Sequence, residues 1–187
     1  RVRGVPGVEW AVRLFKGGPV ARTEAGKFSQ CVVLGLDDAT LVGVPRKMLL
    51  GDWKRLREPN SVVIDKAGYL LLFPGEPLEI GRTLELNDHL ARIVGISDAS
   101  PGFVSFPIIH ARYSEAVNFQ GRERSQMSFI VVRQQPGLTP KQLATRITEQ
   151  TGLRARTRDE FRWDCIRYYL ANTGIPVNFG ITIPIAL

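Results

Sequence analysis

The alternation of apolar and other residues near the start of the chain predicts a long β-hairpin from Val8 to Asp37. Bulky apolar residues alternate with other types over 8–15, and a second apolar run, CVVLGL, covers 31–36. Glycine and proline gather between the two runs, at 17–19 and at 26, where the chain must turn. We expect two long paired strands, with an irregular tip or an extra pair of short strands near it.

The middle of the chain has the densest β pattern. SVVID at 61–65 predicts a strand and 66–72 a short helix, whereas 41–60 is polar and irregular with one helical turn at 54–57. Apolar residues recur over 77–98, and tight-turn residues interrupt them. These features predict a small antiparallel β-rich subdomain over about 36–100.

The last part of the chain alternates between strands and helices. Strands are predicted at 106–111, 127–134 and 153–157, and a short helix at 113–119. Thr139, Pro140 and Gln142 form a capping box that opens a helix ending at Gly152. A second capping box, from Thr157 to Glu160, opens a final helix. The expected fold class is therefore α+β: a strand–helix–strand two-layer sandwich that surrounds an inserted β-rich subdomain.

The last twenty residues, Tyr168 to Leu187, contain no charged residue and no histidine. A bilayer-spanning helix needs about 20 mostly apolar residues, so this segment is typical of the start of a transmembrane helix. The alternative is a soluble protein that ends in a hydrophobic strand. Pro176, Pro184, Asn172 and Asn178 favour that alternative.

The net charge of +7 does not by itself indicate nucleic acid as a partner. Arginines are scattered along the whole chain and are interleaved with acidic residues. Even the densest basic stretch, 154–167, also contains Asp159, Glu160 and Asp164. A solvated surface of mixed charge is the favoured interpretation, and no nucleic-acid binding is expected.

The sequence shows no motif for catalysis, metal binding or a cofactor. His89 and His110 have no metal-ligand spacing to cysteine or carboxylate, and no nucleotide-binding or hydrolase motif occurs. Asp37–Asp38 follows a strand and Asp159–Glu160 opens a helix, where acidic residues have structural roles. Cys31 and Cys165 fit buried apolar positions, and whether they pair is open. No enzyme, cofactor or metal site is therefore expected.

Several segments, taken in their order, resemble the extracytoplasmic domain of MacB-like (FtsX-superfamily) ABC transporter permeases, and most closely the DevC-type exporter permeases. The resemblance covers essentially the whole chain, and the order of the segments carries it. The matching segments are PGVEWAVRLFKG at 6–17, VVLGLDD at 32–38, SVVIDKAG at 61–68, LELNDHLARIVGISD at 84–98, FPIIHARYSEA at 106–116, TGLRARTRDEFRW at 151–163 and TGIPVNFGITI at 173–183.

The resemblance implies a periplasmic segment of an inner-membrane protein. Residues 1–35 and 101–173 would form a porter-like α/β subdomain, 36–100 the inserted β-rich subdomain, and 174–187 the start of a transmembrane helix. Such permeases work as homodimers with a cytoplasmic ABC ATPase, which in the DevC type is a separate subunit. Their periplasmic domains bind a membrane-fusion adaptor that leads to a TolC-like outer-membrane protein. The domain itself would be non-catalytic and would transmit ATP-driven movement during efflux.

Two groups of site residues follow from this hypothesis. Basic and aromatic residues on loop tips are candidates for adaptor docking, with ordinary solvated loops as the alternative; these are Arg46, Lys47, Trp53, Lys54, Arg122 and Arg124. The final helix is the candidate transmission element. Its residues Arg158, Arg162, Tyr168 and Tyr169 suit a position near the membrane, and the alternative is that the tyrosines pack against the sheet.

A second function remains open from the sequence. Related permeases handle lipids, so the domain is alternatively a lipid- or amphiphile-binding extracytoplasmic domain. A large apolar groove would favour this alternative, and a filled core with a polar surface would count against it.

Overall fold

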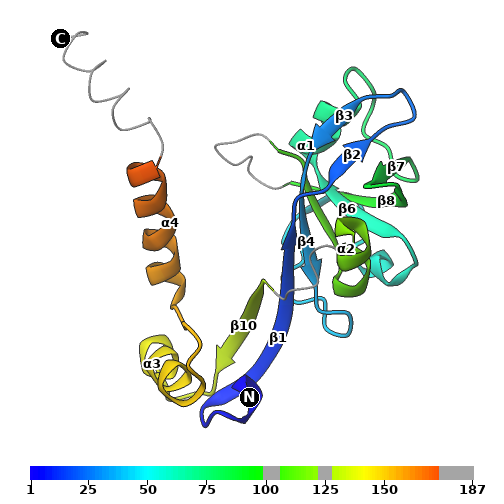
Figure 1. The fold of residues 1–187 in the computed structure, drawn as a ribbon. Coiled ribbons are helices and arrows are strands. Elements are labelled where there is room, and N and C mark those ends of the chain that lie inside the picture. The colour runs from blue at the N-terminus through cyan, green and yellow to red at the C-terminus, as the bar shows by residue number, and fades with distance from the viewer. Residues whose placement is uncertain (99–105, 122–127, 173–187) are drawn as a thin grey trace, which may run out of the picture. The chain divides into compact units, whose positions relative to one another are not determined.

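The computed structural model describes residues 1–98, 106–121 and 128–172, and it confirms the predicted α+β class (Figure 1). The chain divides into two compact units, the first made of residues 1–11 with 132–187 and the second of residues 12–131. The strands are β1 (Val8–Gly17), β2 (Val20–Arg22), β3 (Phe28–Gln30), β4 (Val32–Leu36), β5 (Met48–Gly51), β6 (Ser61–Asp65), β7 (Thr83–Leu86), β8 (His89–Ser97), β9 (Ile108–Arg112) and β10 (Phe129–Gln134). The helices are η1 (Val2–Gly4), η2 (Trp53–Arg57), α1 (Lys66–Leu72), α2 (Tyr113–Gln120), α3 (Pro140–Thr151) and α4 (Arg158–Asn172).

The predicted hairpin is present, and its tip carries the extra pair of short strands. β1 pairs antiparallel with β4, and beyond a bend β2 pairs antiparallel with β3. The bend lies at Gly17 and Gly18, where the Gly18 amide donates to Gln120 Oε1 at 2.7 Å and its carbonyl accepts from Gln30 Nε2 at 2.6 Å. A Cβ on Gly17 would lie 2.3 Å from Gln120 Oε1, so the bend has no room for a side chain there.

The two halves of the bent hairpin join opposite ends of one sheet. The strands follow the order β10-β1-β4-β9-β6-β8-β7-β2-β3, with β5 attached to β8. Because β3 runs directly into β4, the path from β4 through β9, β6, β8 and β7 to β2 returns to its own start. The second unit is therefore a small closed barrel with mixed strand directions, since β4–β9 and β6–β8 are parallel and the remaining pairs antiparallel.

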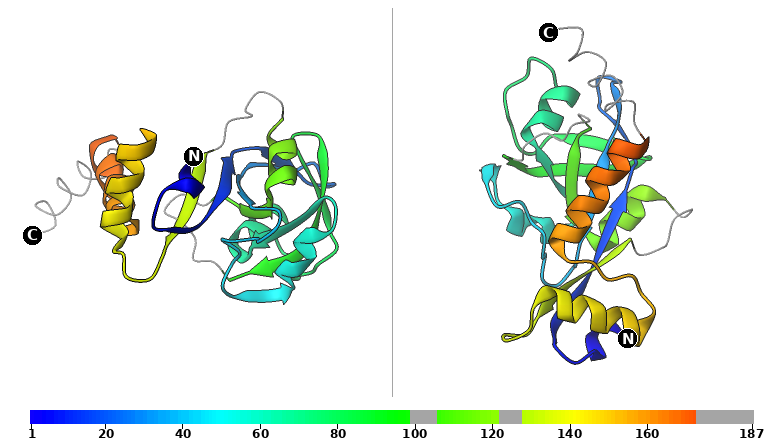
Figure 2. Two further views of the ribbon diagram at one scale, coloured as in Figure 1. Left: turned by 90° about the horizontal axis from the view of Figure 1, so that it is seen from below. Right: turned by 90° about the vertical axis from the view of Figure 1, so that its left-hand side faces the viewer.

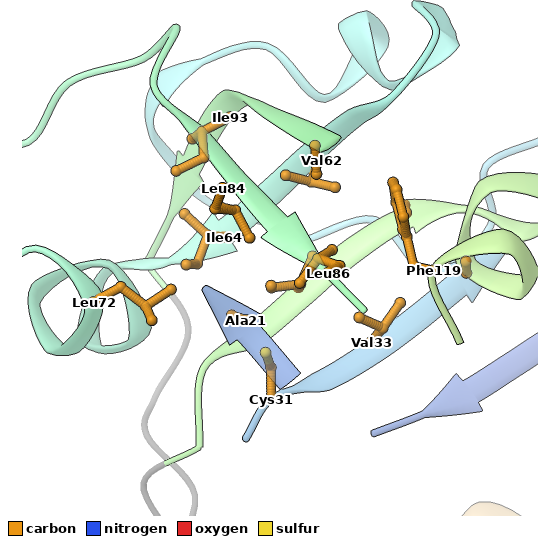
Figure 3. Packing of buried hydrophobic residues seen from close by; sticks show 14 of the residues in the cluster. Ala21, Cys31, Val33, Val62, Ile64, Leu72, Leu84, Leu86, Ile93 and Phe119 are labelled. Carbon is orange, nitrogen blue, oxygen red and sulfur yellow. The ribbon is translucent and has the colours of Figure 1, made fainter. Parts of the chain in front are cut away.

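Side chains fill the interior of this barrel (Figure 3). Inward-facing residues from β2, β4, β6, β7, β8 and β9 are buried, as the period of two along each strand requires. They include Ala21, Cys31, Val33, Val62, Ile64, Leu84, Leu86, Ile93 and Ile109. Helix α2 closes one side, and its Ala116 would lie 2.6 Å from a Cβ on Gly35 of β4. A filled interior makes the barrel a core and not a container.

The outer face of the barrel carries a second apolar cluster under β5 and η2. Leu56 of η2 is fully buried there against Leu41, Val63 and Val94, and Trp53 and Met48 pack against them half-buried. The expected helical turn at 54–57 is confirmed as η2, but the prediction of an irregular 41–60 missed β5. Its short sequence, MLLG, lies among basic residues and has no alternating pattern that would reveal a strand.

In the first unit, α3 lies against η1, β10 and the start of β1 (Figure 2). Leu143 and Ile147 of α3 bury against Val5, Val8 and Ala11. The capping box is formed as predicted, since the Gln142 amide donates to Thr139 Oγ1 at 3.3 Å and the Thr139 amide to Gln142 Oε1 at 3.0 Å. The second box, between Thr157 and Glu160, also forms and opens α4.

The predicted strand at 153–157 is wrong, because these residues are irregular. Their polar groups bond to the neighbouring helices instead of a strand: the Ala155 amide donates to Thr148 Oγ1 at 3.2 Å. Arg154 and Arg156 both reach Asp164 of α4. Residues of LRART therefore contact the two neighbouring helices. The alternating pattern of the sequence alone does not tell such a segment from a β-strand.

The boundaries of the two compact units differ from the division predicted from the family resemblance. Residues 32–36 and 108–120 share one core with residues 61–65 and 83–96, although the resemblance assigned them to different subdomains. The antiparallel subdomain expected over 36–100 also contains a parallel pair, β6–β8. The porter-like and inserted subdomains remain a prediction. In the structure, the boundaries between the two compact units lie before residue 12 and after residue 131.

Asp65 is expected to be the most costly polar side chain to remove from the barrel. It is 1% exposed, and its carboxylate accepts from the Gly68 amide at 3.2 Å and from the Ile108 amide at 2.7 Å. Asp65→Ala leaves two buried amides without a partner, so we expect a loss of about 2–4 kcal/mol in the free energy of unfolding, measured by chemical denaturation. The control is Asp52→Ala, which removes an exposed cap of η2 and should cost about 1 kcal/mol or less. Equal losses in the two variants would contradict this role of Asp65.

Candidate functional surfaces

Four of the predicted docking residues lie close together on the barrel unit. Arg46 and Lys47 precede β5, and Trp53 and Lys54 begin η2. The other two, Arg122 and Arg124, lie outside the residues that the structure describes. The predicted group therefore reduces to one segment, 46–54, on the outer face of the barrel.

The four side chains differ in how free they are. Lys47 pairs with Asp98, which lowers the pKa of the Asp98 carboxyl through the hydrogen bond from Lys47. Trp53 is half-buried against the cluster around Leu56, so part of its role is packing. Arg46 and Lys54 are exposed, and within the described residues their side chains have no ion-pair partner.

The neighbours that complete this surface are not among the six residues named as docking candidates. Leu49 and Leu50 of β5 are 36% and 38% exposed, which places apolar area between the basic residues. Arg55 and Arg92 both bind Glu58, and the hydrogen bond from Arg55 is the main cause of a lowered Glu58 pKa. We call residues 46–57 the β5 surface. The strand was not predicted, so its exposed leucines could not be assigned to it.

The predicted transmission residues all lie on α4, which has no buried residue. Tyr168 and Tyr169 are 63% and 48% exposed, and their rings lie edge to face with 6.0 Å between the ring centroids. The alternative that they pack against a sheet is therefore not what the structure shows for Tyr168. Arg158 and Arg162 are exposed on the same helix.

Apolar residues form two stripes on opposite sides of α4. One stripe contains Phe161, Cys165 and Tyr168, and the other contains Trp163, Ile166 and Leu170. At 100° per residue these spacings align each set along one side of the helix, about half a turn apart. Trp163 and Leu170 are 59% and 56% exposed. A helix with two apolar sides suits contacts with more than its own domain.

Asp164 fixes the start of α4 to the irregular segment before it. Its carboxylate lies 3.1 Å from Arg154, 3.0 Å from Arg156 and 2.8 Å from Arg167. The hydrogen bond from Arg156 is the first cause of a lowered pKa of the Asp164 carboxyl. This cluster was visible in the sequence only as mixed charge.

The membrane segment expected at 174–187 lies outside the described residues. Among the helices that are described, none combines the length and apolar character needed to cross a bilayer.

The described residues show no catalytic arrangement. They contain no cluster of three or more His, Cys, Asp or Glu side chains that could hold a metal ion. Cys31 and Cys165 are free thiols, and burial raises the pKa of Cys31 to about 12, which keeps it protonated and unreactive. Burial also lowers the pKa of His110 to about 4, and its Nδ1 has no partner. His110 is therefore a neutral core side chain on β9, as the sequence indicated for a structural histidine.

Solved structures with this fold include an extracellular domain of an ABC-type transporter and a periplasmic region of MacB. The extracellular domain of the noncanonic ABC-type transporter YknZ from Gram-positive bacteria aligns with a TM-score of 0.61 at 14% identity, over 82% of each chain. The periplasmic region of MacB from Actinobacillus actinomycetemcomitans aligns with a TM-score of 0.57 at 16% identity, over 92% of this chain and 80% of that one. A domain of a putative permease from Porphyromonas gingivalis aligns with a TM-score of 0.53 at 20% identity, over 84% and 75%. These likenesses show the fold.

Residues 1–150 match the MacB-like periplasmic core domain, and the chain belongs to that family. It is thus the periplasmic domain of a MacB-like ABC transporter permease, and the predicted family is confirmed. The family implies an ATPase partner, and the domain itself is not of a known catalytic type. No curated protein matches the chain.

The buried neutral His110 should make the barrel sensitive to acid. Its pKa is about 4 in the folded protein and about 6.5 when unfolded, so between these values only the unfolded chain binds the proton. Stability should therefore fall as the pH drops from about 6.5 to 4, by up to about 3 kcal/mol from this group. Denaturation at several pH values should show a smaller loss over this window in His110→Gln than in the wild type. The exposed His89→Gln is the control, and an unchanged slope in His110→Gln would contradict the assignment.

Proposed function

We propose that this domain docks a periplasmic adaptor through the β5 surface and transmits ATP-driven movement of the permease through α4. The carrying observation is α4 itself, a helix of 15 residues with no buried side chain, on which Trp163 and Leu170 are 59% and 56% exposed. The helix thus contributes no fully buried side chain to the core of its own unit. Exposed aromatic residues on a helix commonly mark a contact surface, so we expect α4 to contact other parts of the transporter.

The β5 surface supports the docking half of the proposal. It combines exposed basic residues with exposed Leu49 and Leu50 and the half-buried Trp53, a mixture of types suited to protein interfaces. The filled barrel behind it provides a rigid base, so docking needs little ordering of the domain. The DevC-like segments noted in the sequence support an exporter with a separate ATPase chain, an adaptor and, through it, a TolC-like outer-membrane protein. A homodimer of the permease completes this assembly.

The lipid-binding alternative has less support. The barrel interior is occupied by its own side chains. A hollow of about 580 Å³ on α3 is lined by polar and charged residues, among them Lys141, Arg146 and Glu149. A hollow of about 200 Å³ beside β2 and β7 has two apolar lining residues, Val20 and Phe28, against four polar or charged ones, Arg22, Glu85, Asn87 and Asp88. Neither has the apolar lining that an acyl chain requires.

Co-purification of the full-length permease with its adaptor tests the docking role. Arg46→Glu combined with Lys54→Glu reverses two exposed charges without removing a described ion pair, and we expect the affinity for the adaptor to fall at least tenfold. Deletion of residues 36–100 would be a poor test, because it removes β5 to β8 and with them the barrel. Lys141→Glu, an exposed lysine on α3, is the matched control. Full adaptor binding by the double variant would remove the β5 surface as the docking site.

The transmission role is tested at Asp164. Asp164→Asn keeps the size of the side chain but removes the charge that Arg154, Arg156 and Arg167 share. If α4 transmits movement through this junction, export by the full transporter should fall several-fold while adaptor binding stays intact. Asp159→Asn on the same helix is the control. Unchanged export in Asp164→Asn would show that the junction does not couple the domain to the membrane.

A further inference from the structure

β5 is an edge strand of the barrel. Its pairing partner is β8, and no other strand of the described residues lies on its second edge. Leu49 has no partner in the register with β8, because the pairing shifts between Met48 and Leu50. Within the described residues the second edge of β5 thus has no paired strand, and an unpaired strand edge is a form of surface to which an extended segment can pair.

The strand is held firmly in place. Gly51 has a φ of +72°, and a Cβ there would lie 2.1 Å from the Val94 carbonyl oxygen. On either side of this close approach, Met48 and Leu56 anchor the segment in the apolar cluster of the outer face. An edge that is already ordered costs little entropy when a partner pairs with it.

The charges around β5 select the partner. Residues 46–57 contain five basic side chains and one acidic one, and although Asp98 pairs with Lys47 and Glu58 with Arg55, the surface keeps a net positive charge. Asp52, the acidic one, is used by the Lys54 amide, which donates to its Oδ1 at 2.9 Å. Arg46 stands before the strand and Lys54 after it, so a positive charge without a described ion-pair partner lies at each end of the edge.

Two features of β5 protect its outer edge from a second copy of the chain. The register shift and the flanking lysines are devices that commonly protect edge strands from self-association. An acidic strand meets no such barrier, because its charges complement both ends.

We propose that the outer edge of β5 pairs with a short, extended, acidic segment of the adaptor, which adds a strand to the barrel. The proposal rests on the docking function above and specifies its chemistry. Backbone hydrogen bonds to Met48–Gly51 hold the segment, Leu49 and Leu50 contact its apolar side chains, and Arg46 and Lys54 face its carboxylates. Because the paired length is short, the charges at its two ends set the register.

Hydrogen–deuterium exchange of the full-length permease, with and without purified adaptor, tests the pairing directly. We expect the amides of Met48–Gly51 to exchange at least tenfold more slowly when the adaptor is bound. The matched control is β3, another short strand of the same barrel that pairs on one side, with β2. Its amides at Phe28–Gln30 should not change.

A backbone variant separates strand pairing from simple charge contact. Leu49→Pro removes an amide at the residue that has no partner in β8, and we expect adaptor affinity to fall at least tenfold while the thermal unfolding of the barrel is kept. Ser29→Pro in β3 is the control. If Leu49→Pro unfolds the barrel, the exchange experiment on the wild type still decides the question.

The outcomes distinguish this inference from the docking function. If Arg46→Glu with Lys54→Glu weakens adaptor binding but β5 exchanges as fast as before, the strand pairing is wrong and docking stands. If that double variant binds normally, the docking function at this surface is wrong. Protection of β5 that grows with permease concentration without adaptor would mean a second copy. Protection by phosphatidylglycerol vesicles alone would mean a membrane surface, and either result would overturn the proposal.

Discussion

The bend in the first hairpin is the constraint on which the barrel depends. One continuous hairpin pairs with β9 through β4, in the half nearest its ends, and with β7 through β2, in the half nearest its tip. A sharp change of direction near Gly17 and Gly18 permits both pairings. The amide and carbonyl of Gly18 would otherwise be lost from the ladder, and the side chains of Gln120 and Gln30 replace their partners. Without this bend the sheet would have two more open edges and no enclosed core.

Local signals in the sequence predicted those elements whose stabilising contacts are local. The capping boxes at Thr139 and Thr157 and the helix after Asp65 all follow from residues within a few positions of one another. β5 and the segment 153–157 did not follow. β5 exists because a distant strand, β8, accepts it, and LRART is irregular because Asp164 binds its arginines. In both cases a long-range contact decides against the local pattern.

The candidate site likewise has a part that residue types predicted and a part that only the structure shows. Arg46, Lys47, Trp53 and Lys54 could be selected from residue type alone, and the structure brings them together on one segment. What residue type could not show is that a paired strand runs between them and that Leu49 and Leu50 lie exposed along it. For α4, the aromatic residues were visible in the sequence, but their arrangement in two opposite stripes emerges only when the helix is known to lack a buried side.

The two units of the domain therefore serve different physical ends. The barrel is compact, fully packed and closed by its own chain, which favours a fixed shape. The helix α4 leaves Trp163 and Leu170 largely exposed and is joined to the preceding segment by ion pairs around the half-buried Asp164, which salt partly screens. Rigidity in one part and an adjustable junction in the other are the properties that a relay between moving proteins requires.

The glycine at position 51 gives the edge strand an unusual kind of dependence. β5 can lie against β8 only because Gly51 has no Cβ: any other residue would place a carbon atom against the Val94 carbonyl oxygen. One added methyl group would lift the end of the strand away from the barrel, although every charge and every leucine of the surface would still be present. The shape of this surface is thus encoded by an absent side chain, which no inventory of basic or aromatic residues would reveal.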